Sequence, residues 1–383
     1  MNILFLVFHG FDPNSGITKK IYAQVQGLRQ LGHKVYLCSY GFDERGHRVR
    51  WVDDQVIADY GTGPMAALKA RCDVKSILDW CLCHGISMAY IRSFHNASPL
   101  TIRLFSHLRK AGIKLAMEIP TYPYDQEYDG FPLKERALLQ VDKMFRNRLA
   151  REVDAIVTFS ELKSIFGQRT ICISNGVDLD AIEMVEPKKE PGMKPLETVH
   201  LTAVAEVHYW HGLDRLIDGL GAYYASNHRR KVFFHIVGGV ADCEMHTSRH
   251  APGFAELMEK WKIEDKVIFH GQLFGQALTD VFRMTNLCVG SLGRHRSGVT
   301  YIKTLKNREY AVRGLPFIYS EQDSDFDGQP YVYKVPADES PIDIHALLRF
   351  LDNLTLTPAQ IRATAEHLSW KNQMQKVVKE LWE

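Results

Sequence analysis

The sequences SGI at residues 15–17 and SGV at residues 297–299 each follow an apolar run and are each predicted to open a helix. The second leads into Lys303, Lys306 and Glu309. A glycine loop at a helix N-terminus suits an anion, and lysines on the following turns add positive charge. A carboxylate nearby accepts hydrogen bonds from hydroxyl groups. The two stretches therefore predict a ligand with phosphate and hydroxyl groups, held between two helix starts.

The first half of the chain alternates strands and helices. Residues 2–8 form a continuous apolar run, which is typical of a strand covered on both faces in a parallel sheet. Apolar residues then recur at helical spacing from Ile17 to Leu31. The alternation continues with strands expected at 34–40, 88–94, 113–119 and 155–160, and with helices at 99–111 and 134–152. We expect a doubly wound domain over residues 1–178.

The second half repeats this kind of pattern after a break. Residues 179–197 are polar and proline-rich, and we interpret them as an interdomain linker. Strands are expected at 198–207, 231–240, 266–271, 286–292 and 315–319, with helices beginning near Trp210, Gly253, Phe274 and Val299. This predicts a second domain over 198–356, and a final helical run, 357–383, that returns to the first. The expected architecture is α/β, with two doubly wound Rossmann-like domains facing a central cleft.

The composition of the chain argues against several classes of function. The net charge of +2 over 383 residues gives no global field of the kind that nucleic-acid binders carry, so nucleic acid is not an expected partner. The apolar start, residues 1–11, is too short for a signal sequence and is expected to be a buried strand. No run approaches the roughly 18 apolar residues of a membrane span. Seven cysteines, an odd number, favour a reducing cytoplasm over a disulfide framework.

Ligands of open α/β sheets bind beyond the carboxyl ends of the strands, which selects a short set of candidates. In the first domain these are Gly16, His95, Glu118, Tyr122, Asp125 and Glu127, and in the second His211, Arg294, Ser297, Gly298, Val299 and Thr300. The carboxylates and tyrosines at 118–127 suit a sugar, although a rigid structural loop explains them equally well. His95 is likewise explained either by a contact with the substrate or by packing within the protein. The Cys and His clusters lack the paired spacing of zinc sites, and no metal is expected.

The stretch EYAVRGLP at residues 309–316 resembles the C-terminal signature of retaining glycosyltransferases with the GT-B fold, family 4. In that signature a glutamate-containing helix ends in Ala-x-x-Gly-x-Pro before a buried strand. Three more segments match in family order, namely SGI at 15–17 with LGHKV at 31–35, SNGVD at 174–178 and HGLDRLI at 211–217. The resemblance covers most of the chain and implies the GT-B fold.

The resemblance also implies roles for the candidates. Glu309 would bond the donor ribose, and the backbone N–H groups of residues 297–300 would bind the diphosphate. The family usually has a second glutamate where this chain has Tyr301, and an arginine and a lysine where it has Glu206 and His211. Lys303 and Lys306, with Arg294 nearby, would then stabilise the leaving group, since fixed cations stabilise the charge that builds on a departing phosphate. No cofactor is implied, because the nucleotide sugar is a substrate.

The function implied is transfer of a sugar, with retention, from a UDP-sugar in preference to a GDP-sugar. The acceptor would be a glycan or a lipid-linked molecule in cell-surface polysaccharide synthesis. A non-catalytic protein that binds nucleotide sugars stays open as an alternative, because of the departures at 206, 211 and 301. Nicotinamide chemistry is disfavoured, because residues 9–16 lack the G-x-G-x-x-G fingerprint. The basic helix around Arg103 and Arg109 fits either contact with the inner membrane face or a solvated surface.

Overall fold

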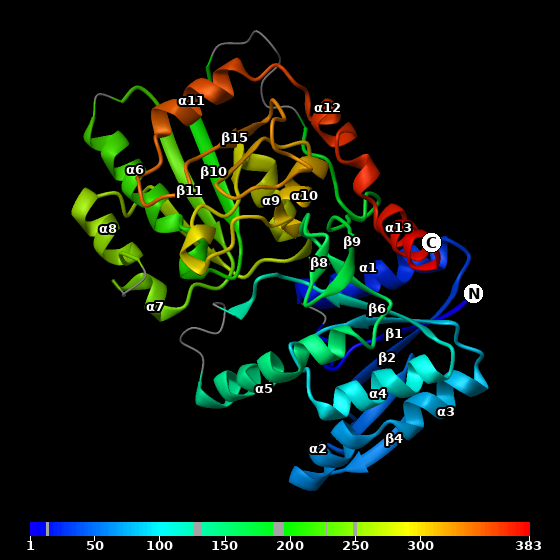
Figure 1. Ribbon diagram of the computed structural model, residues 1–383. Helices are drawn as coiled ribbons and strands as arrows, with labels where there is room; N and C mark the ends of the chain where they lie inside the picture. Colours follow the sequence, from blue (N-terminus) through cyan, green and yellow to red (C-terminus); the bar gives the residue numbers. More distant parts are fainter. Residues whose placement is uncertain (13–14, 126–131, 187–194, 227, 248–250) are drawn as a thin grey trace. The chain divides into compact units, whose positions relative to one another are not determined.

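The computed structural model describes residues 1–12, 15–125, 132–186, 195–226, 228–247 and 251–383 (Figure 1). The chain divides into two compact units. Unit 1 comprises Met1–Gly176 and Ser369–Glu383, and unit 2 comprises Val177–Leu368. Each unit is built around its own sheet, and the fold class predicted from the sequence is confirmed.

Unit 1 contains a sheet with strand order β4-β3-β2-β1-β5-β6-β7-β9-β8. Its strands are β1 (Asn2–Leu6), β2 (Lys34–Phe42), β3 (Arg48–Val52), β4 (Gln55–Gly61), β5 (Met88–Arg92), β6 (Lys114–Ile119), β7 (Ala155–Thr158), β8 (Ser164–Ile165) and β9 (Gln168–Cys172). The strands from β2 to β9 in this order pair in parallel, and β3, β4 and β8 pair antiparallel at the edges. All five strands predicted in this half are present, and the antiparallel edges were not predicted.

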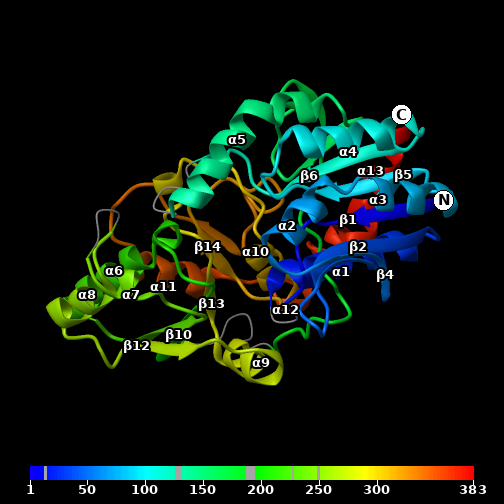
Figure 2. The ribbon, with the colours of Figure 1, turned by 90° about the horizontal axis from the view of Figure 1, so that it is seen from below.

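Helices cover both faces of this sheet (Figure 2). On one face α1 (Gly16–Gln30) and α13 (Trp370–Trp382) pack on alternate residues of β1, and on the other α3 (Lys75–Cys83), α4 (Pro99–Lys110) and α5 (Leu133–Ala150) pack on the residues between. A further helix, α2 (Gly63–Cys72), follows β4. As predicted, α1 begins at the SGI stretch, where the Ser15 side chain accepts a hydrogen bond from the Ile17 N–H at 3.2 Å.

The expected C-terminal helix consists of separate pieces. Residues Pro358–Ala363 form α12 and Glu366–Leu368 form a 3₁₀ turn, both in unit 2. After Ser369, which caps it, α13 returns to unit 1 and packs along α1. The approach is close, since a Cβ atom on Gly27 would lie 2.8 Å from the Trp370 backbone. The lack of a side chain at Gly27 of α1 therefore lets α13 pack closely against α1 within unit 1.

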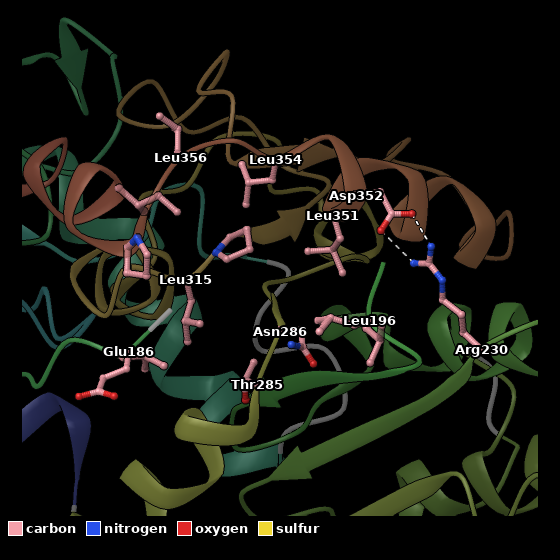
Figure 3. A pocket seen from close by; sticks show the side chains of 16 residues that line it. Glu186, Leu196, Arg230, Thr285, Asn286, Leu315, Leu351, Asp352, Leu354 and Leu356 are labelled. Atoms are coloured by element: carbon pink, nitrogen blue, oxygen red, sulfur yellow. Dashed lines mark hydrogen bonds and ion pairs between the residues drawn. The ribbon is translucent and has the colours of Figure 1, made fainter. Parts of the chain in front are cut away.

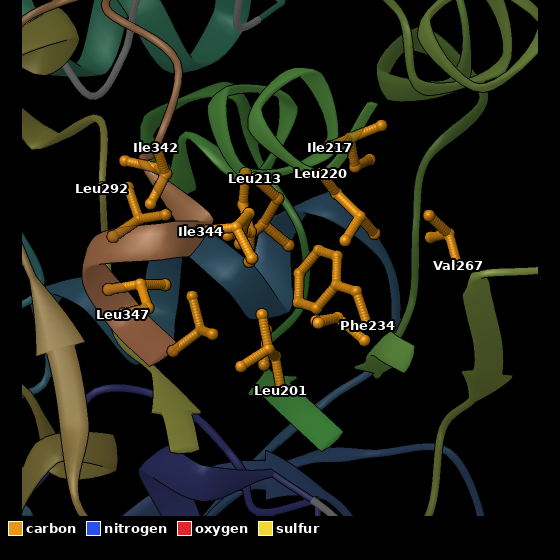
Figure 4. Packing of buried hydrophobic residues seen from close by; sticks show 14 of the residues in the cluster. Leu201, Leu213, Ile217, Leu220, Phe234, Val267, Leu292, Ile342, Ile344 and Leu347 are labelled. Atoms are coloured by element: carbon orange, nitrogen blue, oxygen red, sulfur yellow. The ribbon is translucent and has the colours of Figure 1, made fainter. Parts of the chain in front are cut away.

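Unit 2 contains a parallel sheet with strand order β12-β11-β10-β13-β14-β15. Its strands are β10 (Thr198–Val204), β11 (Lys231–Val237), β12 (Val267–Gly271), β13 (Leu287–Val289), β14 (Phe317–Tyr319) and β15 (Val332–Lys334). Its helices are α6 (Leu213–Ala225), α7 (Asp242–Met245), α8 (Phe254–Trp261), α9 (Gly275–Met284), α10 (Leu305–Val312), α11 (Ile344–Asn353) and α12. Leu201 and Phe234 from the sheet pack against α6 and α11 (Figure 4).

One predicted helix start is wrong, and it concerns the SGV stretch. Arg294–Ser297 form a 3₁₀ turn, which ends at Gly298 with a φ of 68°. The backbone beyond it is extended, because Thr300 and Ile302 exchange hydrogen bonds with Gln322 at 2.7 and 3.0 Å. The helix, α10, therefore begins only at Leu305, with Thr304 as its cap. Lys306 and Glu309 lie on α10, whereas Lys303 precedes it.

Candidate functional site

The carboxyl ends of β10, β13 and β14 gather polar side chains in unit 2. His211 follows β10 in a short 3₁₀ turn, Arg294 follows β13, and Glu321 follows β14. Lys306 stands on the first turn of α10. Neighbouring segments hold these residues in place, since Leu292 donates to the His211 carbonyl at 2.8 Å and Ser320 donates to the Ser291 carbonyl at 3.0 Å. This edge is where open α/β sheets bind ligands.

The charges at this edge perturb one another. Loss of hydration and the nearby positive charge of Arg294 lower the pKa of Lys306 to about 7, against the opposing effect of Glu321. Burial, followed by the charges of Lys306 and Arg294, lowers the pKa of His211 well below its usual value. Two cationic groups and a neutral imidazole thus lie close together beside the N-terminus of α10. Such an arrangement suits an anion, because a negative ligand relieves the repulsion between the cations.

Glu321 is the acidic member of this group, and the sequence analysis did not single it out. Its side chain is 2% exposed, and neither carboxylate oxygen has a hydrogen-bond partner among the described residues. Burial raises the pKa of Glu321 to about 7, although the backbone N–H of Glu321 itself and then the positive charges of Arg294 and Lys306 act in the opposite direction. No sequence motif marks it; the one available signal was its position directly after a predicted strand.

Lys303, expected beside Lys306, belongs to a different cluster. Its ammonium group is 3.3 Å from the Asp325 carboxylate. Asp325 also pairs with Arg308, which is fully buried and bonds Asp323 at 2.8 Å. The extended backbone before α10 directs Lys303 into this ion cluster, so the structure does not place it with Arg294 and Lys306. This corrects the expectation that both lysines lie on turns of the helix that follows the SGV stretch.

Glu309 lies one turn beyond Lys306 and is ion-paired within its own helix. Arg313 donates to one carboxylate oxygen of Glu309 from Nε at 2.9 Å and from Nη2 at 2.7 Å. The side chain of Glu309 is 31% exposed. Among the described residues no hydrogen bond to its second oxygen is found, so that oxygen can accept from a hydroxyl group, and the role toward ribose stays a proposal.

The backbone N–H groups of residues 297–300 were expected to bind a diphosphate. The N–H of Gly298 instead donates to the His295 carbonyl at 3.0 Å, and that of Val299 donates to the Arg294 carbonyl at 3.2 Å. The Ser297 hydroxyl likewise donates to the Arg294 carbonyl. These donors complete the 3₁₀ turn. The helix N-terminus near the cations is that of α10, at residues 304–306.

In unit 1, His95 follows β5 and stacks on Tyr124 with ring centroids 3.8 Å apart. Tyr124 donates to Asp142 at 2.6 Å, and Asp142 also accepts from the Ala97 N–H at 2.9 Å. Burial, with the charge of Arg92, lowers the pKa of His95 to about 4. His95 is therefore neutral near pH 7, held by packing, and available to a substrate only as a neutral hydrogen-bonding group.

Glu118 was expected to contact a sugar, but the structure gives it a different environment. It is fully buried, and both of its oxygens are occupied. One oxygen faces Lys20 at 3.2 Å together with Arg92, and the other accepts from Gln24 and Tyr90, each at 2.6 Å. Although burial alone would raise it, Lys20 and Arg92 lower the pKa of Glu118 to about 2. The carboxylate thus holds α1 to the sheet and is not placed to bind a sugar.

The other first-domain candidates are more accessible. Asp125 pairs with Arg146 at 2.7 Å and with Lys143 at 3.4 Å. Tyr122 packs edge-on against Phe166. Gly16 begins α1, and a Cβ atom built on it would meet nothing within 4 Å. Glu127 lies outside the described residues.

Unit 1 also carries a hollow of about 1340 Å³ between α1 and the strands β2 and β3. Aromatic rings and carboxylates line it, among them Phe11, Tyr22, Tyr40, Trp51, Asp12 and Asp53. The sequence analysis kept the residues after β1 but did not foresee the contribution of β3, since it did not predict that strand. Aromatic faces combined with acidic acceptors are suited to sugar rings.

A second hollow, of about 100 Å³, lies in unit 2 near Thr285, Asn286 and Leu315 (Figure 3). These residues precede β13 and β14, so the hollow is at the amino ends of the strands. Its lining is mostly apolar, and of its charged residues Glu186, Arg230 and Asp352, the last two pair with each other. Neither position nor chemistry makes it a candidate for the ligand discussed above.

Comparisons with known proteins give the fold. No protein-family model matches the chain, and none of the curated proteins matches it in sequence. Among the described residues, no cluster of metal-binding side chains and no helix able to cross a membrane is found.

Solved structures match over the full chain. Sucrose-phosphate synthase from Thermosynechococcus elongatus has a TM-score of 0.58 at 17% identity, covering 100% of this chain and 99% of that one. The catalytic domain of Starch Synthase IV from Arabidopsis thaliana, bound to ADP and acarbose, has a TM-score of 0.60 at 10% identity, and the match covers 100% of this chain and 98% of that one. A mutant of S. aureus TarM, in complex with Fondaparinux, alpha-GlcNAc-glycerol and UDP, has 0.58 at 10%, covering 100% of both chains. The chain therefore has the GT-B fold of these glycosyltransferases, as its resemblance to the retaining enzymes predicts.

Proposed function

We propose that the protein is a retaining glycosyltransferase that takes a sugar from a nucleoside diphosphate sugar, with UDP favoured over GDP as the nucleotide. The observation that carries this proposal is the pair of cations, Lys306 and Arg294, at the carboxyl edge of the second sheet. The GT-B fold supports it, and similar structures were solved with UDP or ADP bound.

In the proposed reaction, an acceptor hydroxyl oxygen bonds the anomeric carbon, the bond from that carbon to the β-phosphate oxygen breaks, and the departing diphosphate, on which negative charge builds, takes the acceptor's proton. Lys306 and Arg294 would stabilise that charge, because both cations stand at this edge before the reaction and are partly buried. The N–H groups at the start of α10 add to the same field. Since protein cations supply this stabilisation, the proposed mechanism is independent of metal. Glu309 would accept a hydrogen bond from a hydroxyl group of the ribose, and Gly16 is a further proposed donor contact.

The proposed acceptor is a glycan or a lipid-linked sugar, as in cell-surface polysaccharide synthesis, and a hexose is the proposed transferred group. Unit 1 would bind the acceptor in the hollow beside α1, where tyrosine and tryptophan faces suit sugar rings and Asp12 suits hydroxyl groups. His95, Tyr122 and Asp125 are further proposed contacts. Peripheral contact with the inner membrane face is proposed only for a lipid-linked acceptor.

A second candidate function is binding of a nucleotide sugar without transfer. It is favoured by Tyr301, whose hydroxyl donates to Ser324 at 2.6 Å and which stands where related enzymes have a glutamate. The pairing of Glu309 with Arg313 points in the same direction.

Turnover separates the two candidates. The purified protein would be incubated in chelator with UDP-glucose, UDP-N-acetylglucosamine, GDP-glucose and GDP-mannose, and release of the nucleotide and of the free sugar would be followed by NMR. Transferase chemistry predicts slow hydrolysis of one donor with the α-configured sugar appearing first, and loss of this activity in Lys306→Ala. Binding of a donor with no release in wild-type protein would instead establish the non-catalytic function.

A further inference from the structure

The buried carboxylate of Glu321 has no partner for either oxygen among the described residues. Its position is fixed by the backbone on both sides. The Ser320 N–H bonds the Ser291 carbonyl at 3.0 Å, and the Gln322 N–H bonds the Thr300 carbonyl at 2.7 Å. The ammonium group of Lys334 donates to the carbonyl of Glu321 itself. The main chain therefore cannot readily turn the side chain out to water.

Leaving such a group without a partner costs free energy, because a buried acceptor loses its hydrogen bonds to water and gains none in return. Buried polar groups in native proteins are almost always bonded, so an unbonded one points to a missing donor. Asn307, the residue after Lys306, has a second such acceptor. Its amide nitrogen donates to Asp323 at 3.5 Å, and its buried Oδ1 oxygen finds no partner among the residues that the structure describes.

The neighbours of Glu321 limit what the missing donor is. A phosphate is excluded at this carboxylate by like charge. A metal ion is disfavoured because Lys306 and Arg294 are both close enough to act on the charge of Glu321. A neutral donor of hydrogen bonds remains, such as water or a neutral group attached to the anion that the cations hold. Hydroxyl groups of the sugar linked to the diphosphate are neutral donors of this attached kind.

We propose that Glu321 is a specificity-determining residue whose carboxylate accepts hydrogen bonds from hydroxyl groups of the transferred sugar. This inference rests on the proposed function, because it assumes that the cations hold the diphosphate of the donor. Two oxygens on one rigid carboxylate match two adjacent hydroxyl groups of a hexose. Charge-assisted bonds of this kind are stronger than neutral ones, so Glu321 contributes to the affinity for the sugar and to its orientation.

The experiment compares each nucleotide with its own sugar conjugate. Binding of UDP, UDP-glucose, GDP and GDP-glucose would be measured by calorimetry for wild-type protein, Glu321→Gln, Glu321→Ala and the control Glu259→Gln, an exposed position in α8. Thermal unfolding would be recorded for each variant. Glutamine keeps the shape of the side chain and removes its charge, so it is the variant expected to fold normally.

The expected result is that Glu321→Gln binds the free nucleotide as wild-type protein does, within about threefold, and binds the sugar conjugate about 10- to 100-fold more weakly, the range expected for bonds to a charged acceptor. Its unfolding temperature should equal or exceed that of wild type, because an unpaired buried charge has been removed. The Glu259→Gln control should change neither quantity.

Other outcomes overturn the inference in distinguishable ways. If Glu321→Gln weakens the binding of UDP or GDP as much as the binding of the sugar conjugate, the carboxylate contacts the nucleoside. The proposed function then stands, but the assignment of Glu321 to the sugar is wrong. If the variant binds all ligands normally but unfolds at a lower temperature, Glu321 serves only as a counter-ion of Lys306. If wild-type protein binds none of the four ligands, the proposed function and the inference both fail.

Discussion

The ammonium group of Lys306 and the guanidinium group of Arg294 repel each other at the carboxyl edge of the second sheet, and the pKa of Lys306 is lowered to about 7 by burial and by this repulsion. Near neutral pH, the lysine of the ligand-free protein is thus only partly protonated. A bound diphosphate would reverse the effect, since it favours the charged form of the amine. Binding of the proposed donor is therefore coupled to uptake of a proton.

This coupling predicts that nucleotide affinity falls as pH rises from 6 to 8. Lys306 loses its positive charge over this range, while ionisation of Glu321 adds negative charge and His211 stays neutral. The ligand's own phosphate also titrates, so the test compares proteins. Between pH 6 and 8 the Kd for UDP should rise about three- to tenfold more in wild-type protein than in Lys306→Arg, whose side chain keeps its charge. Equal pH profiles would show that Lys306 does not titrate in the binding step.

The ion cluster of Arg308 predicts a large stability effect without a direct role in binding. Arg308 and Asp323 are both fully buried and bonded to each other. Asp325 also pairs with Arg308, so it is the removal of Arg308 that leaves the buried carboxylate of Asp323 without its cation, which costs about 3 to 5 kcal/mol. Arg308→Ala should lower the free energy of unfolding by this amount in urea titrations. The control Asp265→Ala, at an exposed ion pair with Lys266, should change it by less than about 1 kcal/mol.

Three histidines across neighbouring strands predict a loss of stability in acid. Ring nitrogens of His200 and His235 lie 2.9 Å apart, as do those of His235 and His270. Burial, together with both neighbours, lowers the pKa of His235 to about 4. The unfolded chain therefore binds more protons than the folded one between pH 6.5 and 4, and stability falls as pH falls through this window. From pH 7 to 5 the loss assigned to His235 is about 2 kcal/mol. Between pH 7 and 5 the His235→Gln variant should lose about that much less stability than wild-type protein, as measured by denaturant titrations at both pH values.

The packing of α13 on α1 predicts opposite outcomes for two glycines of one helix. A Cβ atom on Gly27 would lie 2.8 Å from the Trp370 backbone, whereas one on Gly16 would meet nothing within 4 Å. Gly27→Ala should therefore destabilise the protein by about 1 to 3 kcal/mol, despite the higher helix propensity of alanine. Gly16→Ala should be neutral or slightly stabilising. Similar effects of both substitutions on the unfolding temperature would contradict the close contact.

The sequence was sufficient to predict the parallel strands and most helices, because buried strands and amphipathic helices leave strong periodic patterns. It could not reveal the true start of α10. The extended segment before it is fixed by Gln322, a residue far along the chain, whose N–H donates to the Thr300 carbonyl and whose carbonyl accepts from the Ile302 N–H. The same limit applies to Glu118 and Glu321. Glu118 lies in β6 and Glu321 follows β14. Only tertiary contacts give the first carboxylate a partner for each oxygen and leave the second without one among the described residues.

The most direct test of the central claim is calorimetry of UDP, GDP and ADP with wild-type protein, Lys306→Ala and the control Lys260→Ala, whose side chain is exposed in an ion pair with Asp218. We predict that one nucleotide binds to wild-type protein and to the control with similar affinity. Lys306→Ala should weaken it at least tenfold, since a bond from a charged donor is lost. Binding that is unchanged in Lys306→Ala, or that is absent from wild-type protein for all three nucleotides, would contradict the assignment of this edge as the donor site.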